Sequence, residues 1–313
     1  MADRATREAL GATLIELASE GRDDIVVLDA DLAKATTTVK FKAAYPERFF
    51  DFGIAEQNMI GTAAGLAAGG RTPFASSFAV FAAGRTYDQV RNSVCYGNLN
   101  VKIAATHAGV TVGPDGGSHQ MLEDIALMRV LPNMQVLVPA DFTAACAAIR
   151  IASETPGPFY IRLGRPAVPA LYDEDFAFAP GRAYVLREGA DVTLAACGIM
   201  VSRALEAAEL LAAEGVSAEV VDVMSLKPLD DATILGSARK TGAVVACEEH
   251  SVIGGLGSAV AALLATEAPM PLELVGVHDV FGVSGEAAEL LEHFGLTAVG
   301  VAAAARKAVA RTS

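Results

Sequence analysis

The chain has 313 residues, and its 24 basic and 37 acidic side chains give a formal net charge of −13 at pH 7. Apolar residue types make up 52% of it, which excludes an intrinsically disordered chain. The acidic balance disfavours non-specific binding to nucleic acids, and at about 100–200 residues per domain the length favours two domains.

No uninterrupted apolar stretch approaches the ~18 residues that a membrane span needs, so we expect no membrane association. The first ten residues, MADRATREAL, contain acids and lack the apolar run of a secretory leader. Cys95, Cys146, Cys197 and Cys247 share no Cys-x-x-Cys spacing, which favours small core side chains in a reducing compartment. These features together predict a cytoplasmic protein.

Short apolar strands alternate with helical patterns through the first half of the chain. We expect helices over 5–18, 54–68, 85–96, 119–130 and 142–154, and strands over 24–30, 71–77, 101–106, 135–139 and 159–163. Because this alternation is typical of parallel sheets covered by helices on both faces, it predicts a doubly wound α/β domain over residues 1–165.

Residues 166–187 contain prolines and acids without a clear period, which predicts a linker. Strand and helix patterns alternate again over residues 188–313, so we expect a smaller second α/β domain there. Its strands are expected over 191–197, 218–223, 243–248 and 272–277, and its helices over 201–213, from 230, over 257–265 and from 286.

The segment 51–65, DFGIAEQNMIGTAAG, holds a single glutamate, Glu56, among small and apolar residues. It is either an acid in the first turn of a helix, where the helix dipole favours it, or a buried carboxylate bonded to a ring nitrogen.

Phe78 and Phe81 lie three residues apart and share a face if their segment is helical. They either pack in the core or grip a flat heteroaromatic ring.

The segment 106–129, THAGVTVGPDGGSHQMLEDIALMR, contains His107 and His119 with Asp115 between them in a glycine-rich loop. The loop follows an expected strand, and ligands of open α/β sheets bind beyond the carboxyl ends of strands. Histidines there suit proton transfer or contact with an anion. Histidines bonded only to water, or a metal site of these three residues, are the alternatives, although the spacing fits no standard zinc pattern.

Arg162 and Arg165, in YIRLGRP, follow another expected strand and either bind phosphate or carboxylate or form surface ion pairs. His250, in EEHSVIGGLG, is either catalytic or structural.

The sequence lacks a G-x-G-x-x-G after its first strand, a Walker A motif and a G-x-S-x-G elbow. These absences disfavour a nucleotide-binding dehydrogenase, a P-loop NTPase and an α/β-hydrolase.

The segments DFGIAEQNMIG, SSFAVF and THAGVTVGPDGGSHQ together resemble the transketolase family of thiamine diphosphate enzymes, over essentially the whole chain. The resemblance implies a pyrimidine-binding doubly wound domain followed by the family's smaller C-terminal α/β domain. The Gly-Asp-Gly and Asn segment of the family's diphosphate-binding domain is not found here. The chain therefore resembles the C-terminal subunit of a split transketolase.

A split enzyme implies an N-terminal partner subunit, without which this chain is inactive, and an assembly of two copies of each chain. The cofactor would lie at an interface, with Mg2+ or Ca2+ held by the partner. The implied activity is transfer of a two-carbon ketol unit from a ketose phosphate to an aldose phosphate.

For the cofactor, the resemblance implies that Glu56 hydrogen-bonds N1′ of the aminopyrimidine and so activates it. Phe78 and Phe81 match the family's ring-stacking positions, and Asp31 matches an acid beside the cofactor. Glu56 and His119 are thus the expected catalytic residues.

For the substrate, His119 and Asp115 match residues that contact hydroxyl groups of the donor sugar, while His107, Arg165 and Arg4 match contacts to its phosphate. A phosphate-binding serine of the family falls at Ala35. The neighbouring Thr36 either replaces it, or the terminal anion is bound differently, for instance as a sulfonate.

Other relationships stay open, among them a split transketolase for a specialised sugar, for instance a sulfonated or branched one. The beta subunit of a 2-oxo acid dehydrogenase's thiamine-dependent component shares the length and the glutamate, but DGGSHQ and LGR favour a sugar phosphate. Deoxyxylulose-phosphate synthase is a further relative. A non-catalytic α/β binding protein is disfavoured by the joint presence of Glu56, His107, Asp115 and His119.

Overall fold

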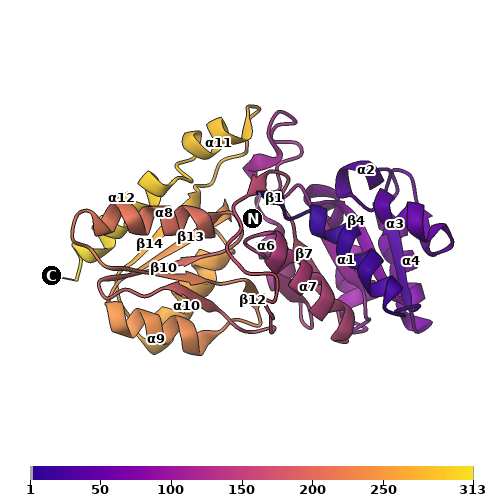
Figure 1. Ribbon diagram of the computed structural model, residues 1–313, viewed down its shortest axis with the longest axis horizontal. Helices are drawn as coiled ribbons and strands as arrows, with labels where there is room; N and C mark the ends of the chain where they lie inside the picture. The colour runs from indigo at the N-terminus through magenta and orange to yellow at the C-terminus, as the bar shows by residue number, and fades with distance from the viewer. Residues whose placement is uncertain (1–2, 313) are drawn as a thin grey trace.

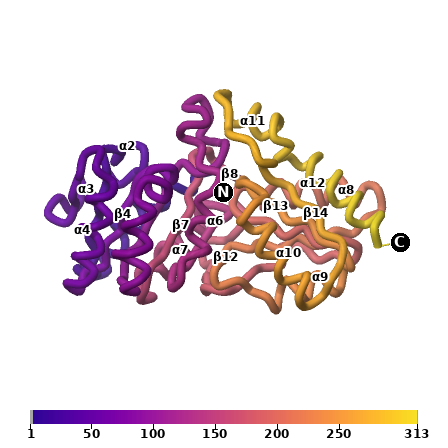
Figure 2. Tube along the Cα trace, turned by 180° about the vertical axis from the view of Figure 1, so that it is seen from behind, coloured from indigo at the N-terminus to yellow at the C-terminus, as the bar shows by residue number. Residues whose placement is uncertain are grey.

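Two mostly parallel β-sheets, one in each half of the chain, organise the computed structural model, which describes residues 3–312. The N-terminal half, coloured indigo to magenta, and the C-terminal half, coloured orange to yellow, lie side by side along the long axis (Figures 1 and 2). The expected α/β fold class is confirmed.

The first sheet has seven strands in the order β12-β6-β7-β5-β4-β2-β3, and all neighbours are parallel except β12 and β6. Its strands are β2 (Ile25–Asp29), β3 (Phe49–Asp51), β4 (Thr72–Phe78), β5 (Lys102–Thr106), β6 (Gln135–Leu137), β7 (Phe159–Arg162) and β12 (Ser225–Lys227). Every residue of β2, β4, β5 and β7 is buried, as expected for parallel strands covered on both faces.

Helices cover both faces of this sheet (Figure 1). They are α1 (Glu8–Ser19), α2 (Ala33–Thr36), α3 (Val39–Ala44), α4 (Glu56–Ala68), α5 (Tyr87–Gln89), α6 (Asp124–Arg129) and α7 (Phe142–Glu154). Because successive side chains of a strand point to opposite faces, Val27 of β2 packs in the core beneath α1 and α7, whereas Leu28 packs in the core beneath α4 and α6.

The second sheet has the order β14-β13-β10-β11-β9, with only β9 antiparallel. Its strands are β9 (Tyr184–Arg187), β10 (Val192–Ala196), β11 (Ala218–Asp222), β13 (Val244–Ser251) and β14 (Leu272–Val277), and its helices are α8 (Met200–Ala212), α9 (Asp231–Thr241), α10 (Leu256–Glu267), α11 (Ala287–His293) and α12 (Ala298–Val309). α8 and α12 pack on one face, and α9 and α10 on the other.

The two halves are joined by more than the expected linker. The strand β12 comes from the C-terminal half, yet it extends the first sheet. The segment 166–187, expected to lack regular structure, contains β8 (Ala167–Val168) and β9. β8 pairs with β1 (Arg4–Ala5), so the start of the chain is fastened beside the end of β7.

Two expected helices differ from the observed elements. Residues 85–96 form no single α-helix, because two wide π-helical turns, η2 (Val80–Arg85) and η3 (Val90–Cys95), flank the short α5. The helix expected over 119–130 is limited to α6, because the residues before it belong to a long loop. Two short 3₁₀ turns, η1 (Pro46–Arg48) and η4 (Val110–Val112), complete the regular structure of residues 3–312.

The segment Ala287–Val309 has the length and mean hydropathy, 1.2, of a membrane span, although charged residues interrupt its apolar stretch. The structure divides it into α11 and α12, which are shorter than the ~18–20 residues of a span. α12 buries Val301, Ala302 and Ala305 in the core of the second domain. The apolar face of α12 thus packs within the second domain. The cytoplasmic location stays a prediction.

Candidate functional site

The parallel strands β2, β4, β5 and β7 end at one edge of the first sheet, and most of the predicted site residues follow these ends. Phe78 is the last residue of β4, His107 follows β5 directly, and Arg165 lies three residues beyond β7. Glu56 opens α4 after the neighbouring β3. This placement agrees with the general rule for ligand sites of open α/β sheets.

Glu56 is a buried carboxylate with one cationic partner. It is the first residue of α4, where the helix dipole stabilises a negative charge, and only 2% of its surface is exposed. Nη1 of Arg85 lies 2.8 Å from both carboxylate oxygens. The sequence singled out Glu56 but contained no indication of this partner, since η2 brings Arg85 back toward α4.

The two predicted phenylalanines lie face to face, although they do not share a helix. Phe78 ends β4 and Phe81 lies in η2, yet their rings are 6.2 Å apart between centroids and only 9° from parallel. The His107 ring stacks on Phe78 at 3.9 Å, and the His119 ring meets Phe81 edge-on at 5.5 Å. Four of the predicted residues therefore form one aromatic cluster.

A basic cluster adjoins these rings, and its centre is an arginine that the sequence did not reveal. Nη1 of Arg7 lies 3.3 Å from Nε2 of His107 and donates to the carbonyl oxygen of Ala35 at 2.8 Å. Because arginine can only donate, Nε2 of His107 must accept, so the imidazole proton sits on Nδ1 and is donated to Thr106 Oγ1 at 2.9 Å.

The charges in this cluster act on one another. Burial, together with the positive charges of Arg7 and Arg165, lowers the pKa of His107 to about 3, so its ring is neutral at physiological pH. Burial and Arg165 also lower the pKa of Arg7. Arg165 is half exposed, donates to the carbonyl oxygen of Val112, and has the Asp115 carboxylate at 3.7 Å. Two arginines so close together favour an anionic ligand.

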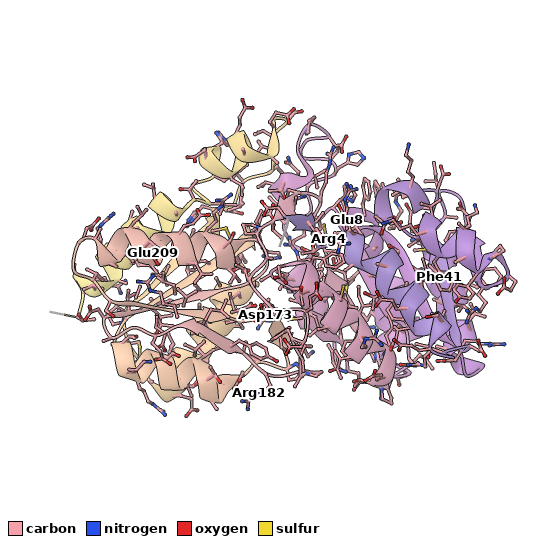
Figure 3. The ribbon with its side chains drawn as sticks, viewed as in Figure 1. Arg4, Glu8, Phe41, Asp173, Arg182 and Glu209 are labelled. Atoms are coloured by element: carbon pink, nitrogen blue, oxygen red, sulfur yellow. The ribbon has the colours of Figure 1, made fainter. Side chains whose placement is uncertain are left out.

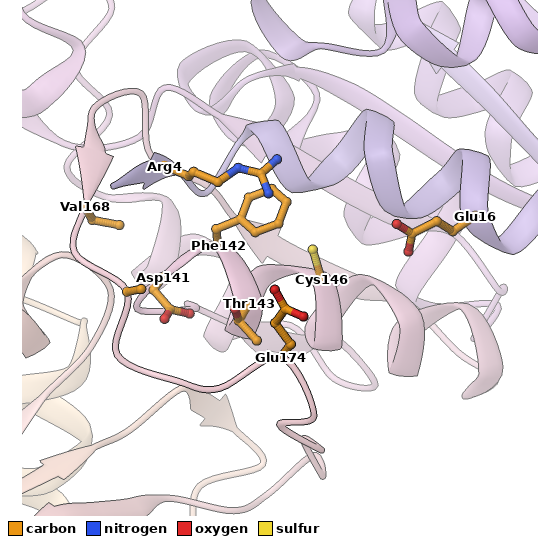
Figure 4. A pocket seen from close by; sticks show the side chains of 9 residues that line it. Arg4, Glu16, Asp141, Phe142, Thr143, Cys146, Val168 and Glu174 are labelled. Atoms are coloured by element: carbon orange, nitrogen blue, oxygen red, sulfur yellow. The ribbon is translucent and has the colours of Figure 1, made fainter. Parts of the chain in front are cut away.

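Arg4, which the resemblance implied as a phosphate ligand, lies elsewhere. It lies near Glu8 at the start of α1, at 3.7 Å (Figure 3). Its guanidinium covers the Phe142 ring at 3.2 Å and lines a cavity of about 430 Å³ with Glu16 and Cys146 (Figure 4). Arg7, three residues later, contacts His107 instead, and the phosphate contact implied for Arg4 stays a prediction.

The sequence also singled out Asp31 and Thr36 as candidate ligand contacts. Asp31 is exposed with a φ of 61°, and its carboxylate makes no hydrogen bond or ion pair within residues 3–312; its backbone N–H donates to Oδ1 of Asp51. The Thr36 hydroxyl is buried and donates to Asp29, so it is not presented to a ligand. A ligand contact of Asp31 therefore stays a prediction, whereas the Thr36 hydroxyl is already engaged by Asp29.

The loop from His107 to Gln120 is held by the C-terminal domain. Oε1 of Glu249 accepts the backbone N–H of Thr111 at 2.7 Å, and a Cβ at Gly109 would overlap the Glu249 carboxylate. Nε2 of Gln120 donates to three carbonyl oxygens, of which that of Val283 belongs to the C-terminal domain. In Figures 1 and 2 this purple loop stands beside α11. Residues from both domains therefore shape the site.

Arg162 and His250, the other candidates from the sequence, are structural. Nε of Arg162 donates to Oδ2 of the buried Asp124 at 2.8 Å, and the Tyr160 hydroxyl donates to the same oxygen at 2.7 Å. Nδ1 of His250 donates to the carbonyl oxygen of Ser251, and burial lowers the His250 pKa to about 4. This buried network joins β7 and α6 to β13 and leaves neither residue for a ligand.

No group of three His, Cys, Asp or Glu residues within residues 3–312 is arranged to hold a metal ion. The metal site considered for His107, Asp115 and His119 is therefore not formed. What converges at the sheet edge is a buried acid, stacked rings and a pair of arginines. This set can bind a flat heteroaromatic ring that bonds a carboxylate, and an anion beside it.

Comparison with known proteins agrees with this arrangement. Residues 2–170 match the family described as transketolase, pyrimidine binding domain, and residues 181–301 match transketolase, C-terminal domain. A split gene transketolase, solved as an inactive beta4 tetramer, is 57% identical with a TM-score of 0.92, and the match covers 100% of both chains.

Two curated relatives act on specialised sugars. The 6-deoxy-6-sulfo-D-fructose transketolase subunit SqwH of Clostridium sp. (strain MSTE9) is 48% identical over 298 residues, 95% of this chain and 92% of that one. A subunit of the apulose-4-phosphate transketolase of Phocaeicola vulgatus is 37% identical over 298 residues, 95% of each chain. The chain belongs to the transketolase family, and within it corresponds to the C-terminal section of an enzyme divided over two chains.

Proposed function

We propose that this chain supplies the cofactor-activating half of a thiamine-diphosphate-dependent transketolase, which moves a two-carbon ketol unit from a ketose to an aldose. The single observation that carries the proposal is the buried Glu56 carboxylate, which Arg85 joins to the Phe81 ring that stacks on Phe78. A buried carboxylate needs a hydrogen-bonding partner, and the aromatic cluster suits a flat ring. The residues present therefore fit an aminopyrimidine.

Each residue then has a defined task. Bound thiamine diphosphate supplies a carbon nucleophile and holds the electrons of the transferred unit. Glu56 exchanges a proton with the ring nitrogen N1′ of the aminopyrimidine, and Phe78 and Phe81 orient that ring. His119 lies edge-on to Phe81 and is placed to contact donor hydroxyl groups or move a proton near them.

The partner chain supplies what residues 3–312 do not provide. These residues include no metal-binding group of three His, Cys, Asp or Glu, so we assign Mg2+ or Ca2+, and the diphosphate, to an N-terminal subunit. We further propose two copies of each chain in the active assembly. The 57% identical relative, solved as an inactive tetramer of beta chains alone, supports this dependence on a partner.

The terminal anion of the donor sugar would bind to Arg7 and Arg165. His107 donates no proton from Nε2 while it accepts from Arg7, so it orients that arginine and leaves the direct contact to the two guanidinium groups. Phosphate and sulfonate both present oxygen acceptors to such a pair. The sulfofructose relative makes a sulfonated donor a specific alternative to a phosphorylated one.

A reconstitution assay tests the proposal. This chain is mixed with its candidate N-terminal subunit, thiamine diphosphate and Mg2+, and supplied with an aldose phosphate acceptor and either a ketose phosphate or 6-deoxy-6-sulfo-D-fructose. We expect ketol transfer that requires both chains. Release of carbon dioxide from a 2-oxo acid without ketol transfer would contradict the proposal and favour a 2-oxo acid dehydrogenase subunit.

A further inference from the structure

The salt bridge between Glu56 and Arg85 places a cation on the atoms that the proposed cofactor contact requires. Nη1 of Arg85 is 2.8 Å from both Glu56 oxygens, while the carboxylate itself is buried. While the guanidinium occupies this position, a ring nitrogen of a ligand cannot form a hydrogen bond to the Glu56 oxygens from the same side. The Glu56 carboxylate has no other hydrogen-bond partner within residues 3–312.

The same guanidinium also covers one of the predicted stacking rings. Cζ of Arg85 lies 4.4 Å from the centroid of Phe81, a distance typical of a cation over an aromatic face. A guanidinium is flat and donates N–H groups in its plane, as an aminopyrimidine does. Arg85 therefore makes both contacts expected of the cofactor ring, one to Glu56 and one to Phe81.

The Arg85 side chain can move away from Glu56. The Arg85 side chain is 44% exposed, whereas that of Glu56 is 3% exposed. The Glu56 carboxylate is therefore held in place by its surroundings, while the Arg85 guanidinium can rotate into solvent. η2, which carries Arg85, is a wide π-helical turn, and such turns are frequent at functional sites. Glu56 cannot move in the same way because it begins α4.

We propose that Arg85 is a displaceable stand-in for the cofactor ring. It neutralises the buried Glu56 carboxylate until thiamine diphosphate binds, and it must move out of the site for binding to occur. This inference rests on the proposed function, because it takes the aminopyrimidine as the incoming ligand. It implies that Arg85 stabilises the isolated chain and weakens the binding of the cofactor.

The test uses Arg85→Ala with two measurements that respond in opposite directions. Thermal unfolding of the isolated chain should occur at a lower temperature, because the buried carboxylate loses its partner. Calorimetric titration of the reconstituted pair with thiamine diphosphate and Mg2+ should show about tenfold tighter binding, since no ion pair has to be broken. Arg85→Lys, which keeps the charge, should restore most of both wild-type values.

Arg91→Ala is the matched control, because Arg91 is exposed and its side chain bonds only Asn92 within residues 3–312. It should leave both measurements unchanged. Weaker or unaltered cofactor binding by Arg85→Ala would overturn the inference and make Arg85 a structural or cofactor-holding residue. If the wild-type pair itself binds no thiamine diphosphate, the proposed function fails, which is a distinct result.

Discussion

Arg7 and Arg4 lie three positions apart, yet their side chains face different parts of the molecule. Arg7 contacts Nε2 of His107, whereas Arg4 covers Phe142 beside a separate cavity. The cause is the short pairing of β1 with β8, which places Thr6, just before α1, beside Gly164. A two-residue bridge of this kind leaves no periodic pattern, so the sequence could not indicate which arginine reaches the site.

The first prediction compares these two arginines. Arg7→Ala should raise KM for an anionic donor sugar about 10- to 100-fold with a smaller change in kcat, because it removes a charge-assisted hydrogen bond of roughly 1.5–3 kcal/mol. Arg4→Ala is the control and should change KM less than about twofold, since a half-exposed ion pair contributes little. Steady-state kinetics of the reconstituted pair measures both. Equal effects of the two substitutions would contradict the assignment.

The second prediction concerns His107, whose pKa is lowered to about 3 by burial and by its arginine neighbours. The folded state thus binds its proton more weakly than the unfolded state, where the pKa is about 6.5. His107 therefore destabilises the fold as pH falls from 6.5 toward 3, and its contribution is constant above pH 7. Between pH 7 and pH 5 this amounts to about 2 kcal/mol of unfolding free energy.

The comparison with His107→Gln isolates this effect, because the other titrating groups are common to both proteins. Urea denaturation at pH 7 and at pH 5 should show a larger loss of unfolding free energy for the wild type than for the variant. The same pH dependence in both proteins would mean that His107 is protonated in the folded state.

At the scale of elements, regular structure was predictable where local pattern and tertiary packing agree. The expected helix over 142–154 and the expected strand over 272–277 match α7 and β14 at both ends. The expected helix over 119–130 did not form in full, because its first residues are bonded to the C-terminal domain through Gln120. The aromatic and histidine members of the candidate site could be predicted from the sequence, but Arg85 could not, because its position depends on a π-helical turn.

The third prediction tests the attachment of the loop to Glu249. Gly109 has a φ of 82° and no room for a Cβ beside the Glu249 carboxylate, whereas Gly215 has a φ of 83° and open space around it. Gly215→Ala should therefore cost only the backbone strain, about 1 kcal/mol of unfolding free energy. Gly109→Ala should cost roughly 3 kcal/mol or more, because it also displaces a buried, hydrogen-bonded carboxylate.

Denaturant unfolding of the two variants gives these free energies, and the activity of the pair gives a second comparison. Gly109→Ala should lower kcat/KM because the loop carries Asp115 and His119, while Gly215→Ala should leave it unchanged. Equal losses of stability and activity would show that Glu249 does not position the loop.

At the scale of the whole molecule, the two domains are joined by a shared sheet and by contacts to the loop of the candidate site. β12 extends the first sheet, and Glu249 and residues 282–285 hold the loop that carries Asp115 and His119. The C-terminal domain thus positions a loop of the candidate site. The fourth prediction is that residues 1–170 alone do not replace the full chain in reconstitution with the N-terminal subunit, even where circular dichroism shows them folded. A fully active fragment would contradict this role.

We propose above all that Glu56 of this chain activates a cofactor that the two chains hold together. Exchange of the C2 proton of bound thiamine diphosphate with D2O, followed by NMR, tests it without knowledge of the sugar. We expect fast exchange in the wild-type pair, exchange about 100- to 10,000-fold slower with Glu56→Gln, and no acceleration by this chain alone. Exchange at the wild-type rate in a Glu56→Gln pair with the cofactor bound would contradict it.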